Sequence, residues 1–167
     1  IMNVLSGTKS TYRNKSLVDP KVSERDLGPI MGARILLVED NAINQDVAKE
    51  FLRPGRFYLD VAEDGVEAVE RVTQNVYDLV LMDIHMPRMD GYEATRKIRE
   101  SISAEQLPIV AMTANVYDSD IEKALEAGMN AHIGKPVQSE ILYSKLLQWI
   151  PAGEREPCAL EEDGIED

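Results

Sequence analysis

The feature that most constrains the fold is a strict alternation between short apolar runs and segments with helical periodicity. The apolar runs, which we expect to be strands, are 34–38, 58–61, 78–82, 108–112 and 129–134. The segments expected to be helices are 41–53, 65–74, 91–100, 118–127 and 139–150. Because parallel strands need crossover connections, this alternation predicts an α/β fold, a parallel sheet covered by helices on both faces.

Local signals refine three of these helices. Ile43, Val47 and Phe51 follow one another at spacing four and form the apolar stripe of the first. Gly128 is expected to cap the end of the fourth helix, and Ser139 the start of the last.

Composition changes near Gly32 and near Pro151 mark the predicted domain boundaries. Residues 1–32 are expected to be a linker, with a short helix left open, because they have no clear apolar period. Residues 33–150 form the globular domain. Residues 151–167 mix proline and glycine with acids and are expected to be an acidic linker or tail.

The charge distribution narrows the function classes. The net charge is −12, and residues 154–167 alone carry seven acids and one base. An acidic domain argues against direct nucleic-acid binding and suits a divalent cation or a basic partner. The sequence contains no apolar run approaching the roughly 20 residues of a membrane helix, so no membrane contact is expected from this chain, although a longer parent could be anchored in the inner membrane. The single cysteine, Cys158, favours a cytoplasmic location.

Reactive residues follow four of the five expected strands. Glu39 and Asp40 follow the first, Asp83 the third, Thr113 the fourth and Lys135 the fifth. Ligands of parallel sheets bind at the carboxyl ends of the strands, so these side chains are expected to converge. Taken singly, each has an ordinary structural explanation as a loop acid, a cap or a solvated lysine.

Together these residues suit phosphoryl transfer. Three neighbouring carboxylates repel one another, which favours a bound cation or raised pKa values, and hard oxygen ligands suit Mg²⁺. Asp83 could then attack phosphorus and form an acyl phosphate. Lys135 and Thr113 would stabilise the phosphoryl oxygens.

Two other function classes stay open at this point. A metal-dependent phosphatase with an aspartyl nucleophile commonly has a second aspartate two residues later, where this chain has His85. A pure interaction module with a decayed pocket would not need the complete acidic set. Acetyl phosphate with Mg²⁺ separates these two classes from a domain that accepts phosphate on Asp83, because only that domain gains one labile acyl phosphate.

Four motifs carry a family resemblance: Leu37–Asn41, Leu81–Gly91, Ala111–Ala114 and Gly134–Pro136. Over 33–150 the chain resembles the response-regulator receiver domains. The resemblance implies a flavodoxin-like doubly wound sheet of order 2-1-3-4-5 with five helices. The segment from Asn41 to Gln45 is similar to receivers of hybrid sensor histidine kinases.

The resemblance also implies a role for each matched residue. Asp83 is the expected phosphoacceptor and a Mg²⁺ ligand. Asp40 is expected to bind Mg²⁺ directly, Glu39 through water, and His85 through its backbone carbonyl.

Further roles concern the response to phosphorylation. Thr113 is the expected switch hydroxyl, and Lys135, with a cis bond to Pro136, the expected phosphate contact. His132 occupies a switch position where the family often has Tyr or Phe, and His85 and Asn115 would tune the lifetime of the phosphate. The stretch 53–56 also departs from the family, which leaves its loop geometry open.

The resemblance implies partners as well. A phosphohistidine domain of a histidine kinase would supply the phosphoryl group. A histidine phosphotransfer domain is a second expected partner, because Trp149–Pro151 and the acidic stretch after it resemble the run from a receiver into such a domain. The sequence shows no glycine-rich ATP lid and no histidine in a dimerisation helix, so the chain is not expected to be a kinase by itself.

Overall fold

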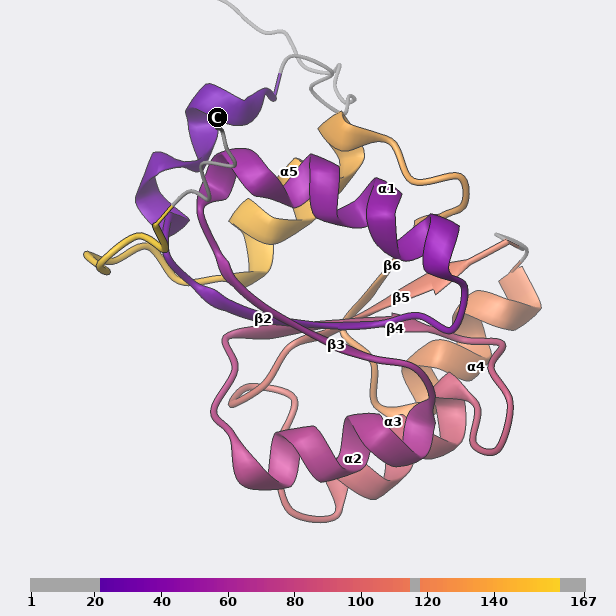
Figure 1. Ribbon diagram of the computed structural model, residues 1–167. Helices are drawn as coiled ribbons and strands as arrows, with labels where there is room; N and C mark the ends of the chain where they lie inside the picture. The colour runs from indigo at the N-terminus through magenta and orange to yellow at the C-terminus, as the bar shows by residue number, and fades with distance from the viewer. Residues whose placement is uncertain (1–21, 115–117, 160–167) are drawn as a thin grey trace, which may run out of the picture.

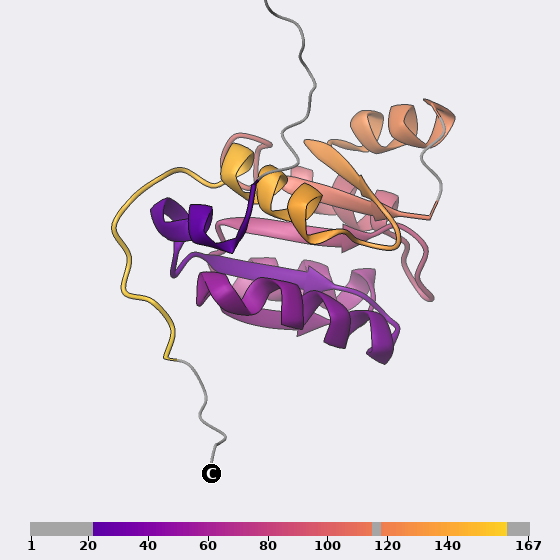
Figure 2. The same ribbon diagram turned by 90° about the horizontal axis from the view of Figure 1, so that it is seen from above.

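The computed structural model describes residues 22–114 and 118–159. A five-stranded parallel sheet forms the middle layer, with α1 and α5 on one face and α2, α3 and α4 on the other (Figures 1 and 2). Along the sheet the strands run β3-β2-β4-β5-β6. Numbered by their order in the chain this is 2-1-3-4-5, so the predicted fold class and strand order are confirmed.

The elements lie close to their expected ranges. The strands are β2 (Arg34–Val38), β3 (Tyr58–Ala62), β4 (Leu79–Asp83), β5 (Ile109–Thr113) and β6 (Ala131–Gly134). The α-helices are α1 (Ala42–Leu52), α2 (Gly65–Gln74), α3 (Gly91–Arg99), α4 (Asp118–Ala127) and α5 (Ser139–Trp149). Two short 3₁₀ helices, η3 (Glu24–Ile30) and η4 (Arg53–Gly55), complete the described elements. Every residue of β4 and β5 is buried, because helices cover both faces of these central strands.

Side-chain caps fix three helices at the carboxyl edge of the sheet. Asn41, Asp64 and Asp90 each accept a hydrogen bond from a backbone N–H in the first turn of α1, α2 or α3. The predicted cap at Gly128 is confirmed: its φ is +110°, and the N–H groups of residues 128 and 129 return to the last turn of α4. The predicted cap at Ser139 is wrong, because the capping position is Gln138 and no side chain caps α5.

Two of the three residues in the apolar stripe of α1 lie at the surface, and the third, Phe51, packs partly buried against the core. Ile43 and Val47 are 73% and 44% exposed, whereas Ala48 and Leu52 are buried. The spacing of Ile43, Val47 and Phe51 identified a helix correctly. It identified the packed face only in part, because Ala48 and Leu52, the residues that α1 buries most completely, lie outside that stripe.

The described parts of both flanking segments pack against the domain. Leu27 and Ile30 of η3 are 0% and 1% exposed and belong to the same apolar cluster as the inner faces of α1 and α5. These two residues precede the boundary predicted at Gly32, so η3, a short helix of the kind that composition left open, adds to the core of the domain predicted for 33–150. Beyond α5, the chain from 151 to 159 runs back along the amino ends of the strands (Figure 1). No helix in the described ranges is both long and apolar enough to cross a membrane.

Candidate functional site

Three carboxylates meet at the carboxyl edge of the sheet. Glu39 and Asp40 follow β2 and Asp83 ends β4; these strands pair directly, with Val38 opposite Met82. One carboxylate oxygen from each of Glu39, Asp40 and Asp83 lies within 4.8 Å of the other two. Glu39 and Asp83 are buried, at 2% and 4% exposure, while Asp40 is exposed. The sequence-predicted cluster is thus assembled in the fold, with one face open to solvent.

Lys135 reaches this cluster from the carboxyl end of β6. It follows β6, and its peptide bond to Pro136 is cis, as the resemblance implied. Its Nζ lies 3.0 Å from Glu39 Oε1 and 3.1 Å from Asp83 Oδ1. One ammonium thus faces three carboxylates among the described side chains, so negative charge remains in excess.

The excess charge shifts the titration of the buried groups. Burial, and then the charge of Glu39, raise the pKa of Asp83 to about 6, against the charge and hydrogen bond of Lys135 and the hydrogen bond from the His85 N–H. Burial tends to lower the pKa of Lys135, but hydrogen bonds and charges from Glu39 and Asp83 outweigh it and raise that pKa.

This donor set fits a divalent cation. Three hard oxygen donors with uncompensated charge, one of them facing solvent, match the preference of Mg²⁺ for a few carboxylates and several retained waters. A cation at this position would relieve the repulsion that raises the pKa of Asp83.

The orientation of Glu39 depends on residues that sequence reasoning missed. Its Oε2 accepts hydrogen bonds of 3.3 Å from the Asn41 N–H and from Asn44 Nδ2. Gln45 Nε2 donates to the backbone oxygen of Glu39 at 2.7 Å. The available signal was position: these residues occupy the cap and first turn of the helix that directly follows the acids.

Three other residues predicted from the sequence belong to β5, to β6 and to the segment after β5. Thr113 ends β5 and is buried at 2% exposure; its carbonyl accepts a 2.8 Å hydrogen bond from the Lys135 N–H, which joins the two strand ends. His132 lies within β6, opposite Ala111, and burial followed by the charge of Lys145 lowers its pKa. Asn115 lies outside the described residues.

The loop between β4 and α3 also contains groups that sequence reasoning missed. Arg88 forms an ion pair with Asp64, the capping residue of α2. Neither Arg88 nor Asp64 was among the reactive residues predicted from the strand ends. A contact between two loops leaves no local pattern in the sequence, so this ion pair could not be predicted.

The chain is similar to known proteins in sequence. Residues 35–147 match the family described as "Response regulator receiver domain". The chain is 35% identical over 150 residues to "Probable histidine kinase 1" of Oryza sativa, covering 71% of the chain and 16% of that protein. It is 40% identical over 126 residues to "Hybrid signal transduction histidine kinase B" of Dictyostelium discoideum, covering 69% and 6%. The chain thus spans only a small part of the length of these relatives.

Solved structures show the same fold with higher coverage. The receiver domain of the sensor histidine kinase PA1611 of Pseudomonas aeruginosa, described with a magnesium ion coordinated in its active-site cleft, is 42% identical, with a TM-score of 0.66 over 71% of this chain and 97% of that one. A co-crystal of the Saccharomyces cerevisiae histidine phosphotransfer protein Ypd1 and the receiver domain of Ssk1 matches at 33% identity and a TM-score of 0.67, over 71% and 89%.

Proposed function

The chain belongs to the response regulator receiver domain family, and from that premise we propose that it accepts a phosphoryl group from a phosphohistidine onto Asp83. The observation that carries this proposal is the convergence of Lys135 and three carboxylates, with Lys135 Nζ 3.1 Å from Asp83 Oδ1. Receiver domains act in two-component signalling; the acceptor atom and the metal dependence are the specific proposals for this chain.

The transfer balances without a further reactant. A carboxylate oxygen of ionised Asp83 attacks phosphorus in line and forms an O–P bond while the N–P bond of the phosphohistidine breaks. With its other ring nitrogen protonated, the imidazole leaves neutral and carries the electron pair of the broken bond. Because the pKa of Asp83 is about 6, this carboxyl is mostly ionised at neutral pH.

The surrounding residues bind and orient the reacting groups. Glu39, Asp40, Asp83 and the backbone carbonyl of His85 would hold Mg²⁺, which when bound supplies positive charge to the phosphoryl oxygens. Lys135, which contacts both Glu39 and Asp83, would supply a second positive charge. Thr113 would donate a hydrogen bond to a phosphoryl oxygen, and its shift toward the phosphate, with His132 as the second switch residue, would change the β5–α4–β6 face. His85 and Asn115 would tune the lifetime of the acyl phosphate.

The partners follow from the same chemistry. We propose a phosphohistidine domain of a histidine kinase as the donor and a histidine phosphotransfer domain as the next acceptor, in a cytoplasmic compartment. The kinase relatives and the co-crystal of a receiver with Ypd1 support this proposal. A longer parent, a hybrid histidine kinase, would hold the ATP-binding activity in other domains; this chain would catalyse only its own phosphoryl transfer and dephosphorylation.

Labelling with acetyl phosphate tests the proposal. The protein with Mg²⁺ is expected to gain one phosphoryl group that hydroxylamine removes, and Asp83→Asn is expected to gain none. Asp90→Asn is the matched control, because Asp90 is an acid of the loop that follows Asp83 and caps α3, and asparagine caps equally well.

Three results would refute the proposal. Labelling of Asp83→Asn would exclude Asp83 as the acceptor. Multiple turnover of a phosphate ester would indicate a phosphatase, and absence of labelling of the unaltered protein would indicate an interaction module.

A further inference from the structure

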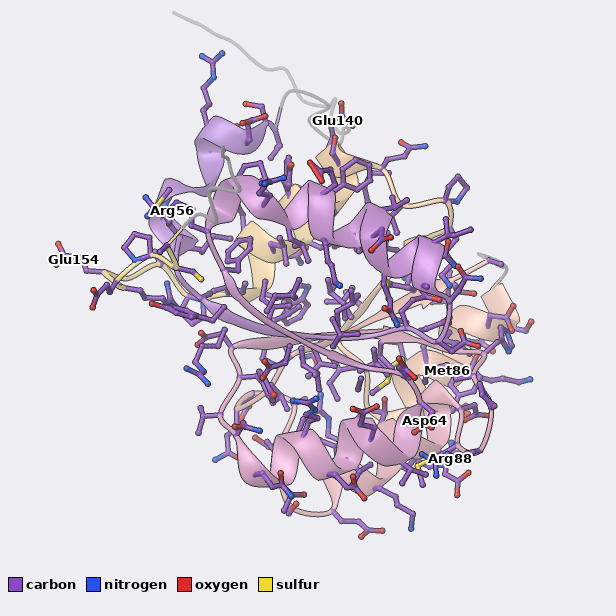
Figure 3. All side chains as sticks on the ribbon, in the orientation of Figure 1. Arg56, Asp64, Met86, Arg88, Glu140 and Glu154 are labelled. Atoms are coloured by element: carbon purple, nitrogen blue, oxygen red, sulfur yellow. The ribbon has the colours of Figure 1, made fainter. Side chains whose placement is uncertain are left out.

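The loop between β4 and α3 is held by an arginine–carboxylate pair outside the reacting cluster. Arg88 Nε donates a 2.7 Å hydrogen bond to Asp64 Oδ2, and Arg88 Nη2 lies 2.7 Å from the same oxygen. Figure 3 shows the two side chains next to each other at the carboxyl edge of the sheet, beside Met86 of the same loop. Asp64 is itself fixed, because its Oδ1 caps α2 by accepting from the Glu67 N–H at 2.9 Å.

Backbone contacts tie the same loop down at its tip and at its base. At the tip, the Gly65 N–H donates to the carbonyl of Met89 at 3.0 Å. A Cβ at Gly65 would lie 2.5 Å from that carbonyl oxygen, so α2 and the loop approach as closely as glycine allows. At the base, the Gly91 N–H donates to the carbonyl of Ile84 at 2.8 Å.

Arg88 adopts a backbone conformation that a side chain disfavours. Its φ is +67°, in the left-handed region, which costs an L-residue roughly 1 kcal/mol. Residues persist in such conformations where surrounding contacts hold them. Here the contact is the ion pair with Asp64, in which the Arg88 side chain is 63% exposed but the Asp64 side chain is only 11% exposed. The carboxylate that receives the guanidinium is thus shielded from solvent.

His85 begins this loop, two residues after the proposed phosphoacceptor. Its backbone N–H donates a hydrogen bond to the Asp83 carboxylate, and its carbonyl is a proposed metal ligand. The position of the loop therefore sets the position of two backbone groups at the cluster.

We propose that Arg88 is a positioning residue: through Asp64 it holds the β4–α3 loop so that the backbone of His85 faces the acidic cluster, and it thereby sets the affinity for Mg²⁺. This inference rests on the proposed function for the identity of the metal. Arg88 itself contacts neither the metal nor the phosphoryl group.

A neighbouring ion pair supplies a matched control. Arg71 and Glu67 lie on α2, 3.4 Å apart and about one-third exposed, and join two turns of one helix. Arg71→Ala removes the same charge as Arg88→Ala but releases no loop. Exposed pairs of this kind contribute little, so Arg71→Ala is expected to leave Mg²⁺ binding unchanged.

The test measures the Mg²⁺ dissociation constant by calorimetry for Arg88→Ala, Asp64→Asn and the double variant. Asparagine at position 64 keeps the cap of α2 and removes the charge. Each single variant is expected to bind Mg²⁺ about three- to tenfold more weakly, and the double variant no more weakly than either, because both remove one interaction. Arg88→Ala makes the protein more negative and Asp64→Asn makes it less negative, so a general charge effect would shift the two affinities in opposite directions.

Two further readouts separate positioning from a general structural role. The rate of labelling by acetyl phosphate at saturating Mg²⁺ is expected to stay within twofold of the unaltered protein, so that the loss appears in metal affinity alone. In metal-free protein, amide exchange at Gly65, whose N–H bonds to the loop, is expected to accelerate at least fivefold in both variants. Arg88→Lys, which keeps the charge, is expected to restore part of the affinity.

Unchanged Mg²⁺ affinity, additive losses in the double variant, or an equal loss in Arg71→Ala would each overturn the inference. If the unaltered protein binds no Mg²⁺ and is not labelled, the proposed function fails and the metal-affinity role fails with it. If the unaltered protein is labelled and the variants match it, only the inference fails.

Discussion

The two ends of the sheet are built from opposite kinds of contact (Figure 2). At the carboxyl ends of the strands, buried acids repel one another around a single lysine. At the amino ends, apolar side chains of η3 and backbone hydrogen bonds of the segment 151–158 complete the core. Figure 3 places Arg56 and Glu154 at the amino end and Asp64 and Arg88 at the carboxyl end.

The difference separates stability from reactivity. At the carboxyl edge, burial and the charge of Glu39 raise the pKa of Asp83, and the excess of carboxylates over ammonium groups suits a cation. The amino edge contains no such cluster among the described residues and contributes buried area instead. We therefore expect truncations at the amino edge to lower stability without changing the chemistry, whereas removal of an acid from the cluster is expected to change the chemistry and to raise stability.

The largest effect is expected from Leu27→Ala. Leu27 is fully buried in η3, which packs against α5, so truncation leaves a cavity in the core. The free energy of unfolding measured with urea is expected to fall by about 2–5 kcal/mol. The labelling rate of the protein that remains folded is expected to be unchanged.

Val76→Ala is the control for this truncation. Val76 is 80% exposed, so its removal is expected to change the free energy of unfolding by less than about 0.5 kcal/mol. A loss for Leu27→Ala as small as that for Val76→Ala would mean that η3 does not belong to the core.

A smaller effect, of opposite sign, is expected from Asp83→Asn. The carboxyl of Asp83 titrates near 3.8 when unfolded and near 6 when folded. Between these values the folded state keeps a proton that the unfolded state has lost, so the contribution of Asp83 to stability falls as pH rises through this window. In metal-free protein at pH ~7.5, Asp83→Asn is expected to raise the free energy of unfolding by about 1–2 kcal/mol, discounted because Lys135 loses a partner.

The pH dependence and the metal dependence both check this sign. The advantage of Asp83→Asn is expected to vanish below pH ~4, where Asp83 is protonated in both states. Saturating Mg²⁺ is expected to stabilise the unaltered protein more than the variant and to reduce the difference. A variant less stable than the unaltered protein at neutral pH without metal would show that the lost contact with Lys135 outweighs the burial of the Asp83 charge and its repulsion by Glu39.

The sequence predicted the carboxyl edge better than the amino edge, for a physical reason. In a parallel sheet the carboxyl ends of all strands lie at the same edge. The convergence of Asp40, Asp83 and Lys135 therefore followed from their places after strands. The packing of Leu27 could not be predicted in the same way, because a short 3₁₀ helix with two buried residues has no period to detect.

Contacts between loops were beyond prediction at both edges. The pairing of Arg88 with Asp64 depends on how α2 and the β4–α3 loop approach in space. The exposure of Ile43 and Val47 on α1 was not predicted for a related reason. Both residues fit the helical period, but the way the helix packs on the sheet decides which of its residues are buried.

The smallest effect is expected from Arg155→Ala, which tests how firmly the segment after α5 is attached. Arg155 Nη2 donates to the carbonyl of Pro151 at 2.8 Å, and Arg155 Nε lies 3.9 Å from Asp78 Oδ2. Arg155 Nη1 is buried without a hydrogen-bond partner among the described groups. The cost of burying this group offsets part of the stability that the two contacts of Arg155 contribute. The free energy of unfolding is therefore expected to fall by only about 0.5–1 kcal/mol.

Amide exchange localises this loss. The Gly153 N–H bonds to the carbonyl of Pro29 and the Cys158 N–H to that of Arg56, so exchange at both is expected to accelerate in Arg155→Ala. Exchange at Gly65, at the opposite edge, and the rate of labelling are expected to stay unchanged. Arg53→Ala, which removes an exposed pair with Glu50, is the control for the lost charge. If Arg155→Ala altered labelling while Arg53→Ala did not, the two edges would be coupled through the sheet, and stability and reactivity could not be assigned to them separately.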